Sequence, residues 1–320
     1  MCTSVEGIPH NPVRSIVVYD STTILVGVDG CGVYSVSRLA STTNAASLLF
    51  NANEGVHGVL HGNGIYALLV DTWSDIFIGS YSGGIDIARP VGSIAAIYMH
   101  QHNNTQTLLN DHVNSVTQLS SSALAMGTDD GISVLNPLTG EWRHIARDIV
   151  VLSLCPKPDG EGLLAATYGN GVCEISAKGE VRKLYGVDIL GDNHIHDLLF
   201  DRNGHLWIGC QDAQLVEVMQ GKFWYYPVDN VKSLALLPDG RIAAGTIKGL
   251  YIVTPGQTEV KELPYFSSDP NQVNRYVLDL FIHDERYIDI ATDGGGLYVY
   301  DLRNGNCRQF TMKDGLPSNT

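Results

Sequence analysis

Polar side chains recur at one position of a repeated apolar pattern, Val-x-Ser/Asp/Gly-apolar. Five of its seven copies carry a hydrogen-bonding residue at x, and the other two carry Leu152 and Leu278. The five polar residues are Arg14, His57, Asn114, His196 and Lys232. Such groups suit a polyhydroxylated or anionic ligand, and an arginine can hold a carboxylate or sulfate through two parallel hydrogen bonds. The alternative is that they bond to neighbouring segments and to solvent.

Two tyrosines and one arginine extend this set of candidate ligand-binding residues. Tyr81 and Tyr168 follow apolar runs and lie in expected tight turns, where a role in the core is less natural. Saccharide sites combine flat aromatic faces with planar hydrogen-bonding side chains on rigid walls, so both rings are candidates for stacking on a ligand. Otherwise they pack on a neighbouring loop. Arg275 ends a long polar segment and is a further candidate.

The densest group of potential metal ligands runs from Asp188 to Asp197. His194 and His196 are two positions apart, so on a strand they would share a face and could bind a metal ion. Asp188 and Asp192 could instead hold Ca²⁺ in a loop. The simpler interpretation is a polar loop that enters a strand, so we expect no cofactor.

Established catalytic motifs with a clear mechanism are absent from the sequence. There is no His-Glu-x-x-His, no Walker loop, no Gly-x-Ser-x-Gly and no acidic calcium loop. Turn carboxylates could serve an enzyme, although aspartate is equally a good turn former. These carboxylates are Asp29, Asp129, Asp130, Asp212 and Asp293.

The elements that must position these residues form a repeat. The segment Asp314–Thr320 echoes Glu6–Pro12, and seven copies of one unit between Gly7 and Gly315 give 308/7 = 44 residues per copy. Each unit contains four short strand signals, two of them around a Gly-Thr core and a glycine turn. This period and strand content predict an all-β, seven-bladed β-propeller with four antiparallel strands per blade, formed by residues 1–320 as a single domain.

Each blade is expected to begin with an inner strand that carries the x position. These strands are predicted at Val13–Ile16, Val56–Leu60, Val113–Leu119, Val150–Leu154, Ile195–Phe200, Val231–Leu236 and Val277–Phe281. Trp207 falls in a strand motif and is expected in the core. Cys31, Cys155, Cys173 and Cys210 are expected to be small buried residues. Long polar connections at Met99–His112, Leu184–His194 and Pro264–Asn274 would crowd one face around the channel mouth, where binding sites usually lie.

Composition limits the classes of function. The formal net charge of −14 argues against nucleic acid, whose binding proteins usually present a basic face. No apolar stretch reaches the ~18 residues of a transmembrane helix, and residues 1–7 lack the features of a signal peptide. We therefore expect either a cytoplasmic chain or one whose leader is absent.

The unit resembles the two-component regulator propeller repeat. The segments Asn203–Gly209, Asp293–Asp301 and Asp314–Asn319 match its Asp-Gly-x-Leu-Trp-Ile-Gly, Gly-Gly-Leu-Tyr-Asp and Asp-Gly-Leu-Pro-Ser-Asn parts. The resemblance implies the N-terminal propeller of a periplasmic sensor, cut at the start of the next repeat. It also implies further propeller, β-sandwich and histidine kinase domains in the parent chain, with any kinase activity in those domains.

The resemblance and the missing catalytic motifs favour a non-enzymatic propeller that senses oligosaccharides from polysaccharide breakdown. One alternative is a propeller lyase, lactonase or hydrolase that acts on a carbohydrate at the channel mouth, since fold does not determine function. Another is a protein-interaction scaffold, although the Trp-Asp signature of WD repeats is missing. A further hypothesis is that this propeller mainly forms a homodimer and that the ligand binds where it meets other domains.

Overall fold

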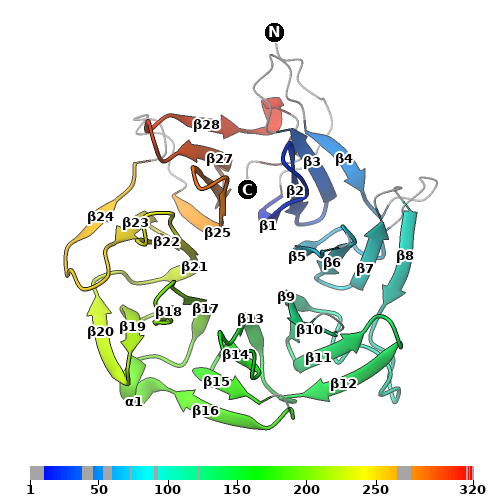
Figure 1. Cartoon of the computed structure of the whole chain (residues 1–320). Helices are drawn as coiled ribbons and strands as arrows, with labels where there is room; N and C mark the ends of the chain where they lie inside the picture. The colour runs from blue at the N-terminus through cyan, green and yellow to red at the C-terminus, as the bar shows by residue number, and fades with distance from the viewer. Residues whose placement is uncertain are drawn as a thin grey trace. The chain divides into compact units, whose positions relative to one another are not determined.

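The computed structural model shows an all-β chain, and the fold is the predicted seven-bladed β-propeller (Figure 1). The structure describes residues 11–37, 46–52, 60–72, 74–89, 93–120, 123–176, 178–264, 275–314, 316 and 318. The chain divides into two compact units, which we treat separately. Unit 1 comprises Met1–Tyr98 with Pro264–Thr320, and unit 2 comprises Met99–Leu263.

Unit 1 contains three antiparallel sheets, which are blades 1, 2 and 7 in chain order. Blade 1 comprises β1 (Val13–Val18), β2 (Thr23–Val28), β3 (Gly32–Ser37) and β4 (Ser47–Phe50). Blade 2 comprises β5 (Ile65–Val70), β6 (Ile76–Ser80), β7 (Gly84–Arg89) and β8 (Ser93–Tyr98). Blade 7 comprises β25 (Tyr276–His283), β26 (Tyr287–Asp293), β27 (Gly296–Asp301) and β28 (Cys307–Phe310), followed by the 3₁₀ turn η1 (Met312–Asp314).

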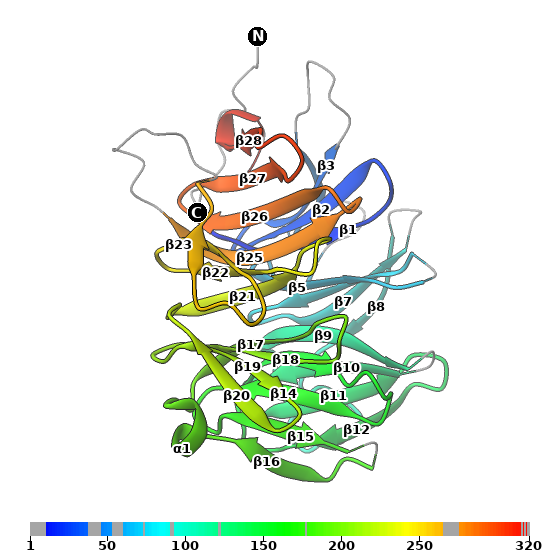
Figure 2. The same ribbon diagram turned by 60° about the vertical axis from the view of Figure 1, so that its left-hand side comes forward.

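Unit 2 contains blades 3 to 6. Blade 3 comprises β9 (Val113–Ser120), β10 (Ala123–Thr128), β11 (Gly131–Asn136) and β12 (Glu141–Ile145), and blade 4 comprises β13 (Val151–Pro156), β14 (Leu163–Thr167), β15 (Val172–Ile175) and β16 (Val181–Tyr185). Blade 5 comprises β17 (Ile195–Phe200), β18 (Leu206–Cys210), β19 (Leu215–Met219) and β20 (Lys222–Tyr226), and blade 6 comprises β21 (Val231–Leu236), β22 (Ile242–Thr246), β23 (Gly249–Val253) and β24 (Val260–Glu262). The short helix α1 (Val187–Leu190) lies beside β16 (Figure 2).

One predicted inner strand is wrong. The first strand of blade 2 is β5, which pairs with β6 from Ile65↔Ser80 to Val70↔Ile76, and Leu60 lies outside any strand. The predicted segment Val56–Leu60 otherwise falls on residues 53–59, outside the described part of the chain, as does the candidate residue His57. Both segments are apolar and β-prone, so composition alone did not separate them. The x position of blade 2 is therefore Tyr66.

Apolar clusters between neighbouring blades form the core, because a single four-stranded sheet cannot cover both of its faces. Within unit 1, one cluster joins blades 1 and 2 and another joins blades 7 and 1. Within unit 2, clusters join blades 3 and 4, blades 4 and 5, and blades 5 and 6. Trp207 is fully buried, as predicted, and so are Cys31, Cys173 and Cys210, whereas Cys155 is only partly buried.

The repeated glycine of the second strand has a steric reason. A Cβ at Gly27, Gly127 or Gly209 would lie 2.6–2.8 Å from a methyl carbon on the next blade. In each case that methyl carbon belongs to the first residue of the next inner strand, namely Ile65, Val151 and Val231. The glycine therefore permits the close approach of successive blades.

Candidate functional site

A β-bulge recurs at the same place in every blade. One residue near the start of each first strand, the second residue in blades 1 to 6 and the third in blade 7, is skipped in the pairing with the second strand. The skipped residues are Arg14, Tyr66, Asn114, Leu152, His196, Lys232 and Leu278. A bulge takes a residue out of the ladder and re-aims its side chain, and bulges are frequent next to functional sites. The sequence pattern thus identified a real structural position, with Tyr66 in place of His57.

Several bulge residues contact the first residue of the turn that follows the second strand in the same blade. This partner lies fifteen positions later in the sequence. We call these contacts rim pairs. They are Arg14 with Asp29 at 3.2 Å, Tyr66 with Tyr81 at 5.2 Å between ring centroids, Asn114 with Asp129 at 2.8 Å, and His196 with Gln211 at 2.9 Å.

In unit 1, two rim pairs join into a unit 1 rim cluster of Arg14, Asp29, Tyr66 and Tyr81. The Arg14 guanidinium bonds to Asp29 and lies 4.9 Å from the centre of the Tyr66 ring, and the Tyr66 hydroxyl donates to Asp29 at 3.2 Å. Tyr81 remains 48% exposed. The positive charge of Arg14 already has a carboxylate partner, so the open feature of this cluster is the aromatic face of Tyr81.

In unit 2, side chains from blades 4, 5 and 6 form a second group, the unit 2 rim cluster of Tyr168, His194, His196, Gln211 and Lys232. The Tyr168 ring packs on His194 with a 4.3 Å centroid distance and is still 50% exposed. The main chain of Gln211 donates to the His194 carbonyl at 2.9 Å. His196 contacts both Gln211 and Lys232, the latter at 2.7 Å.

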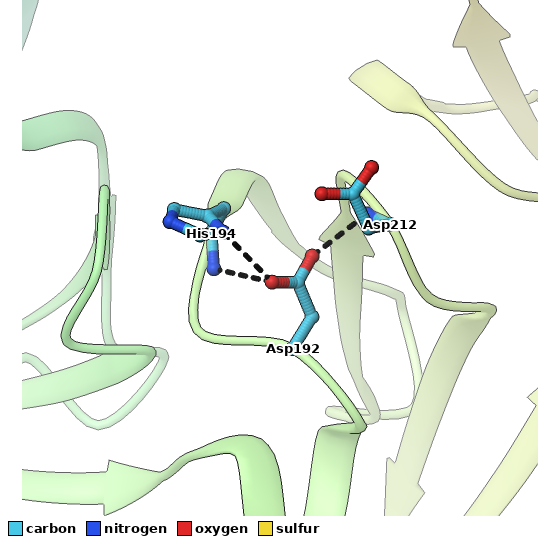
Figure 3. A group of neighbouring side chains, drawn as sticks. All are labelled: Asp192, His194 and Asp212. Atoms are coloured by element: carbon cyan, nitrogen blue, oxygen red, sulfur yellow. Dashed lines mark hydrogen bonds and ion pairs between the residues drawn. The ribbon is translucent and has the colours of Figure 1, made fainter.

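Asp192 fixes the loop that carries His194 (Figure 3). Its carboxylate accepts hydrogen bonds from the main chain and Nδ1 of His194, at 2.9 and 3.0 Å. It also accepts one from the main-chain nitrogen of Asp212 at 2.7 Å. Burial alone would raise the pKa of Asp192, but these donors outweigh it and the pKa is lowered. Asp192 is therefore an ionised anchor that holds the His194 ring under Tyr168.

The other half of the unit 2 rim cluster brings two basic side chains into contact. Burial lowers the pKa of His196, and the neighbouring ammonium of Lys232 lowers it further. Burial also lowers the pKa of Lys232, against the opposing influence of Asp212. Two groups that can both carry positive charge are in direct contact here, and the ammonium of Lys232 disfavours the charged form of His196.

Two groups of described residues offer three potential metal ligands within 4.8 Å of one another. The first is Asp192, His194 and Asp212; it includes neither Asp188 nor His196. Asp212 contacts Asp192 through its main chain and not through its carboxylate (Figure 3). The donors around Asp192 are those of a folded loop, so a metal ion would have to displace His194 from it.

The second group, Asp201, His205 and Glu217, fastens the strands of blade 5 together. His205 Nδ1 lies 2.8 Å from Glu217, the Tyr226 hydroxyl donates to Glu217 at 2.5 Å, and the Trp207 indole donates to Asp201 at 3.3 Å. Both carboxylates are buried and have protein donors. This network gives Trp207, the tryptophan of the repeat motif, a role in the hydrogen bonding that holds the strands of blade 5 together.

The remaining predicted residues lie apart from these clusters. Asn114 bonds to Asp129 and to the Val151 carbonyl at 3.0 Å, which joins blades 3 and 4. Arg275 is exposed directly before β25. The sequence interpretation missed Tyr66 and Gln211, and it considered Asp29 and His194 only for other roles. The fifteen-residue spacing to the bulge position is the signal that would have found Tyr66, Asp29 and Gln211.

Residues 189–212 match the family model described as two component regulator propeller. This segment therefore carries a two component regulator propeller repeat. The matched segment runs from α1 to the turn after β18 and includes His194, His196 and Gln211. The resemblance predicted from the sequence is thereby confirmed, and the repeat that matches supplies three of the five residues of the unit 2 rim cluster.

Solved structures with the same fold include two extracellular domains from B. thetaiotaomicron. One is described as part of a hybrid two component system (TM-score 0.70, 17% identity, 91% of this chain and 40% of that chain). The other is described as part of a one component system (TM-score 0.70, 18% identity, 92% of this chain and 39% of that chain).

The WD40 propeller domain of Doa1 is nearly as similar, with a TM-score of 0.69, 14% identity, and 95% and 96% of the two chains covered. At such identities the likeness shows the fold alone. This chain spans about 40% of the length of the two bacterial domains. A search of curated proteins found no match to it, and no described helix is long and apolar enough to cross a membrane.

Proposed function

We propose that this chain is a non-enzymatic, extracytoplasmic sensing propeller of a hybrid two-component regulator, and that it binds oligosaccharides released from polysaccharides. The observation that carries this proposal is the unit 2 rim cluster, because three of its five residues lie within the segment that matches the regulator repeat. In it, an exposed aromatic ring lies next to planar and charged hydrogen-bonding groups on bulged strands.

The chemistry of the cluster fits a saccharide. A sugar ring presents an apolar face of C–H groups and a rim of hydroxyls, so it needs a flat aromatic surface beside donors and acceptors. Tyr168 offers the surface, and its ring is held by His194, which Asp192 fixes in turn. His196, Gln211 and Lys232 offer the polar groups. Tyr81 over Tyr66 offers a comparable aromatic surface in unit 1.

Asp192, the carboxylate that holds His194 in the unit 2 rim cluster, is poorly suited to acid–base catalysis. A general acid needs a carboxyl group whose pKa is raised toward the working pH. The pKa of Asp192 is lowered, and its oxygens are occupied by main-chain and histidine donors. These features support binding without turnover.

The proposed setting follows from the repeat and from its structural relatives. Both bacterial relatives are described as extracellular domains, which supports a periplasmic location for this chain. We propose that residues 1–320 form one propeller of a longer parent chain, with a further propeller, a β-sandwich and a histidine kinase. The propeller would then transmit binding to those domains and would not itself transfer phosphate.

A thermal-shift screen of the purified chain against neutral and anionic oligosaccharides, with and without Ca²⁺ or EDTA, tests the proposal. A ligand at 100 times its dissociation constant that binds only the folded state adds about 2.7 kcal/mol of stability. We expect a selective rise in melting temperature for one saccharide class, and chromatography of the incubated mixture should show that saccharide unchanged.

Two results would contradict the proposal. Conversion of the saccharide to shorter products would indicate an enzyme. A well-folded sample that responds to no saccharide would move the site to other domains and leave this chain a structural or dimerising element, which its oligomeric state in solution would then show.

A further inference from the structure

One nitrogen atom in the unit 2 rim cluster has two partners that require opposite protonation states. His196 Nε2 lies 2.9 Å from Gln211 Oε1 and 2.7 Å from Lys232 Nζ. Gln211 turns its Nε2 toward Asp212 Oδ2 at 3.4 Å, which leaves its oxygen facing the histidine. A carbonyl oxygen needs Nε2–H as a donor, whereas an ammonium needs the Nε2 lone pair as an acceptor. Only one of these contacts can be a hydrogen bond at a time.

Lys232 is also a cation with no carboxylate in direct contact among the described residues. Among the described residues, no carboxylate oxygen lies within 4.0 Å of its Nζ, and its recorded polar partner is His196 alone. The contrast with the unit 1 rim cluster is direct, because the equivalent bulge residue Arg14 is paired with Asp29 at 3.2 Å. Charged groups that are partly withdrawn from water normally have a partner of opposite sign.

We propose that Lys232, His196 and Gln211 form an oxyanion subsite, which takes the carboxylate or sulfate group of an acidic saccharide. The oxyanion accepts a hydrogen bond from the Lys232 ammonium. His196 Nε2 no longer has to accept one from Lys232, so it can carry a proton and donate a hydrogen bond to Gln211 Oε1. Binding therefore resolves the competition for one nitrogen and places a negative charge in direct contact with the Lys232 ammonium. The saccharide part of this inference rests on the proposed function, whereas the anion part does not.

The surrounding charges agree with this assignment. Burial lowers the pKa of both Lys232 and His196, so both cations are destabilised in the free protein. The groups that act on them are Asp212, which raises the pKa of Lys232, and Asp192 and His194, which act on His196 in opposite directions. The two aspartates reduce the positive potential at this site, but neither carboxylate forms an ion pair with the Lys232 ammonium. Asp192 is already held by main-chain donors.

NMR of the protein labelled with ¹³C at lysine Cε and with ¹⁵N in histidine tests the anion subsite. Sodium sulfate and sodium acetate are titrated at constant ionic strength, and the two salts distinguish a sulfate preference from a carboxylate preference. We expect a saturable shift of the Lys232 resonance and conversion of His196 to the Nε2–H tautomer. If the resonance of Lys232 shifts no more than that of the exposed Lys222 with either salt, the proposal is wrong.

Two substitutions make the test independent of overall folding. Gln211→Glu places a carboxylate beside His196 and should abolish the anion response while the protein remains folded. Lys222→Met removes the same charge as Lys232→Met from an exposed position, and it should retain the response that Lys232→Met loses. An anion response that survives both Gln211→Glu and Lys232→Met would overturn the assignment.

The saccharide arm uses trigalacturonate and its fully methyl-esterified form. Because hydrogen bonds to charged groups are stronger than neutral ones, the acid should bind roughly tenfold tighter than the ester, and Lys232→Met should remove that preference. Equal affinity of the wild-type protein for acid and ester would refute the subsite and leave the proposed function standing. A sulfate or acetate response without binding of any saccharide would support the anion subsite and refute the proposed function.

Discussion

Replacing Asp197 by asparagine should change how stability depends on pH, because this carboxylate joins three blades of unit 2. Ser153 of blade 4 donates to Asp197 Oδ1 at 2.8 Å, and the main chain of Leu234 in blade 6 donates to Oδ2 at 2.8 Å. The main chain of Leu198 donates to Oδ1 at 2.9 Å. Burial raises the pKa of Asp197 to about 6, and the three donors only partly oppose it.

The sign and size of the effect follow from linkage. The folded-state pKa lies about two units above the usual value of 3.8, so the fold favours the protonated form. That preference is fully present below pH ~4 and is lost as pH rises through ~6, which lowers the free energy of unfolding by about 3 kcal/mol. Asparagine cannot ionise. Its side-chain NH₂ would face one of the three hydrogen-bond donors, which should lower the free energy of unfolding by ~1–3 kcal/mol.

The Asp197→Asn protein should therefore be less stable than the wild type at pH 4, and the deficit should vanish or reverse at pH 8. Urea unfolding at the two pH values, at equal ionic strength, measures this difference. Asp159→Asn is the control, because the main-chain N–H of Glu161 lowers the pKa of that exposed carboxyl and gives the opposite sign. If the deficit of Asp197→Asn were the same at both pH values, the account of Asp197 would be refuted.

Three further predictions concern the same unit. Gly209→Ala should lower the free energy of unfolding by ~1–3 kcal/mol, because its Cβ would lie 2.8 Å from Val231 Cγ1; unchanged thermal melting would contradict the steric role. Trp207→Ala should cost ~3–5 kcal/mol in urea unfolding, since the indole is fully buried and bonds to a carboxylate, and a loss below 1 kcal/mol would argue against it. Lys232→Met should be at least as stable as the wild type at pH 7, because it removes a partly buried ammonium whose pKa is lowered, and clear destabilisation would show that the amine is structural.

The fold was predictable because the sequence signals of each blade lie close together along the chain. A Gly-Thr strand, a glycine turn and a second apolar strand form a hairpin whose signals lie within about 15 residues, and seven of them in register leave little choice of architecture. The first strand of blade 2 was misplaced because Val56–Leu60 and Ile65–Val70 are equally apolar. The fifteen-residue spacing from Tyr66 to Tyr81 distinguishes them, since it recurs from Arg14 to Asp29.

The site was predictable only in part. The bulge position and its partner fifteen residues later in the same blade could be read from the sequence, but the contacts between blades could not. Lys232 meets His196 across 36 positions, and Tyr168 meets His194 across 26. Such contacts depend on the packing of one blade on the next, which the sequence of a single blade does not contain. The contrast between Arg14, which has a carboxylate in contact, and Lys232 was likewise visible only in the structure.

The most direct test of the central claim compares two tyrosines with similar exposure. Tyr168 is 50% exposed in the unit 2 rim cluster, and Tyr225 is 44% exposed on β20. Calorimetric titration with the saccharide that most stabilises the wild type should show binding weakened by about tenfold or more in Tyr168→Ala and unchanged in Tyr225→Ala, as expected when an aromatic stacking surface is lost. Unchanged affinity in Tyr168→Ala, or an equal loss in both variants, would contradict a saccharide site at this rim.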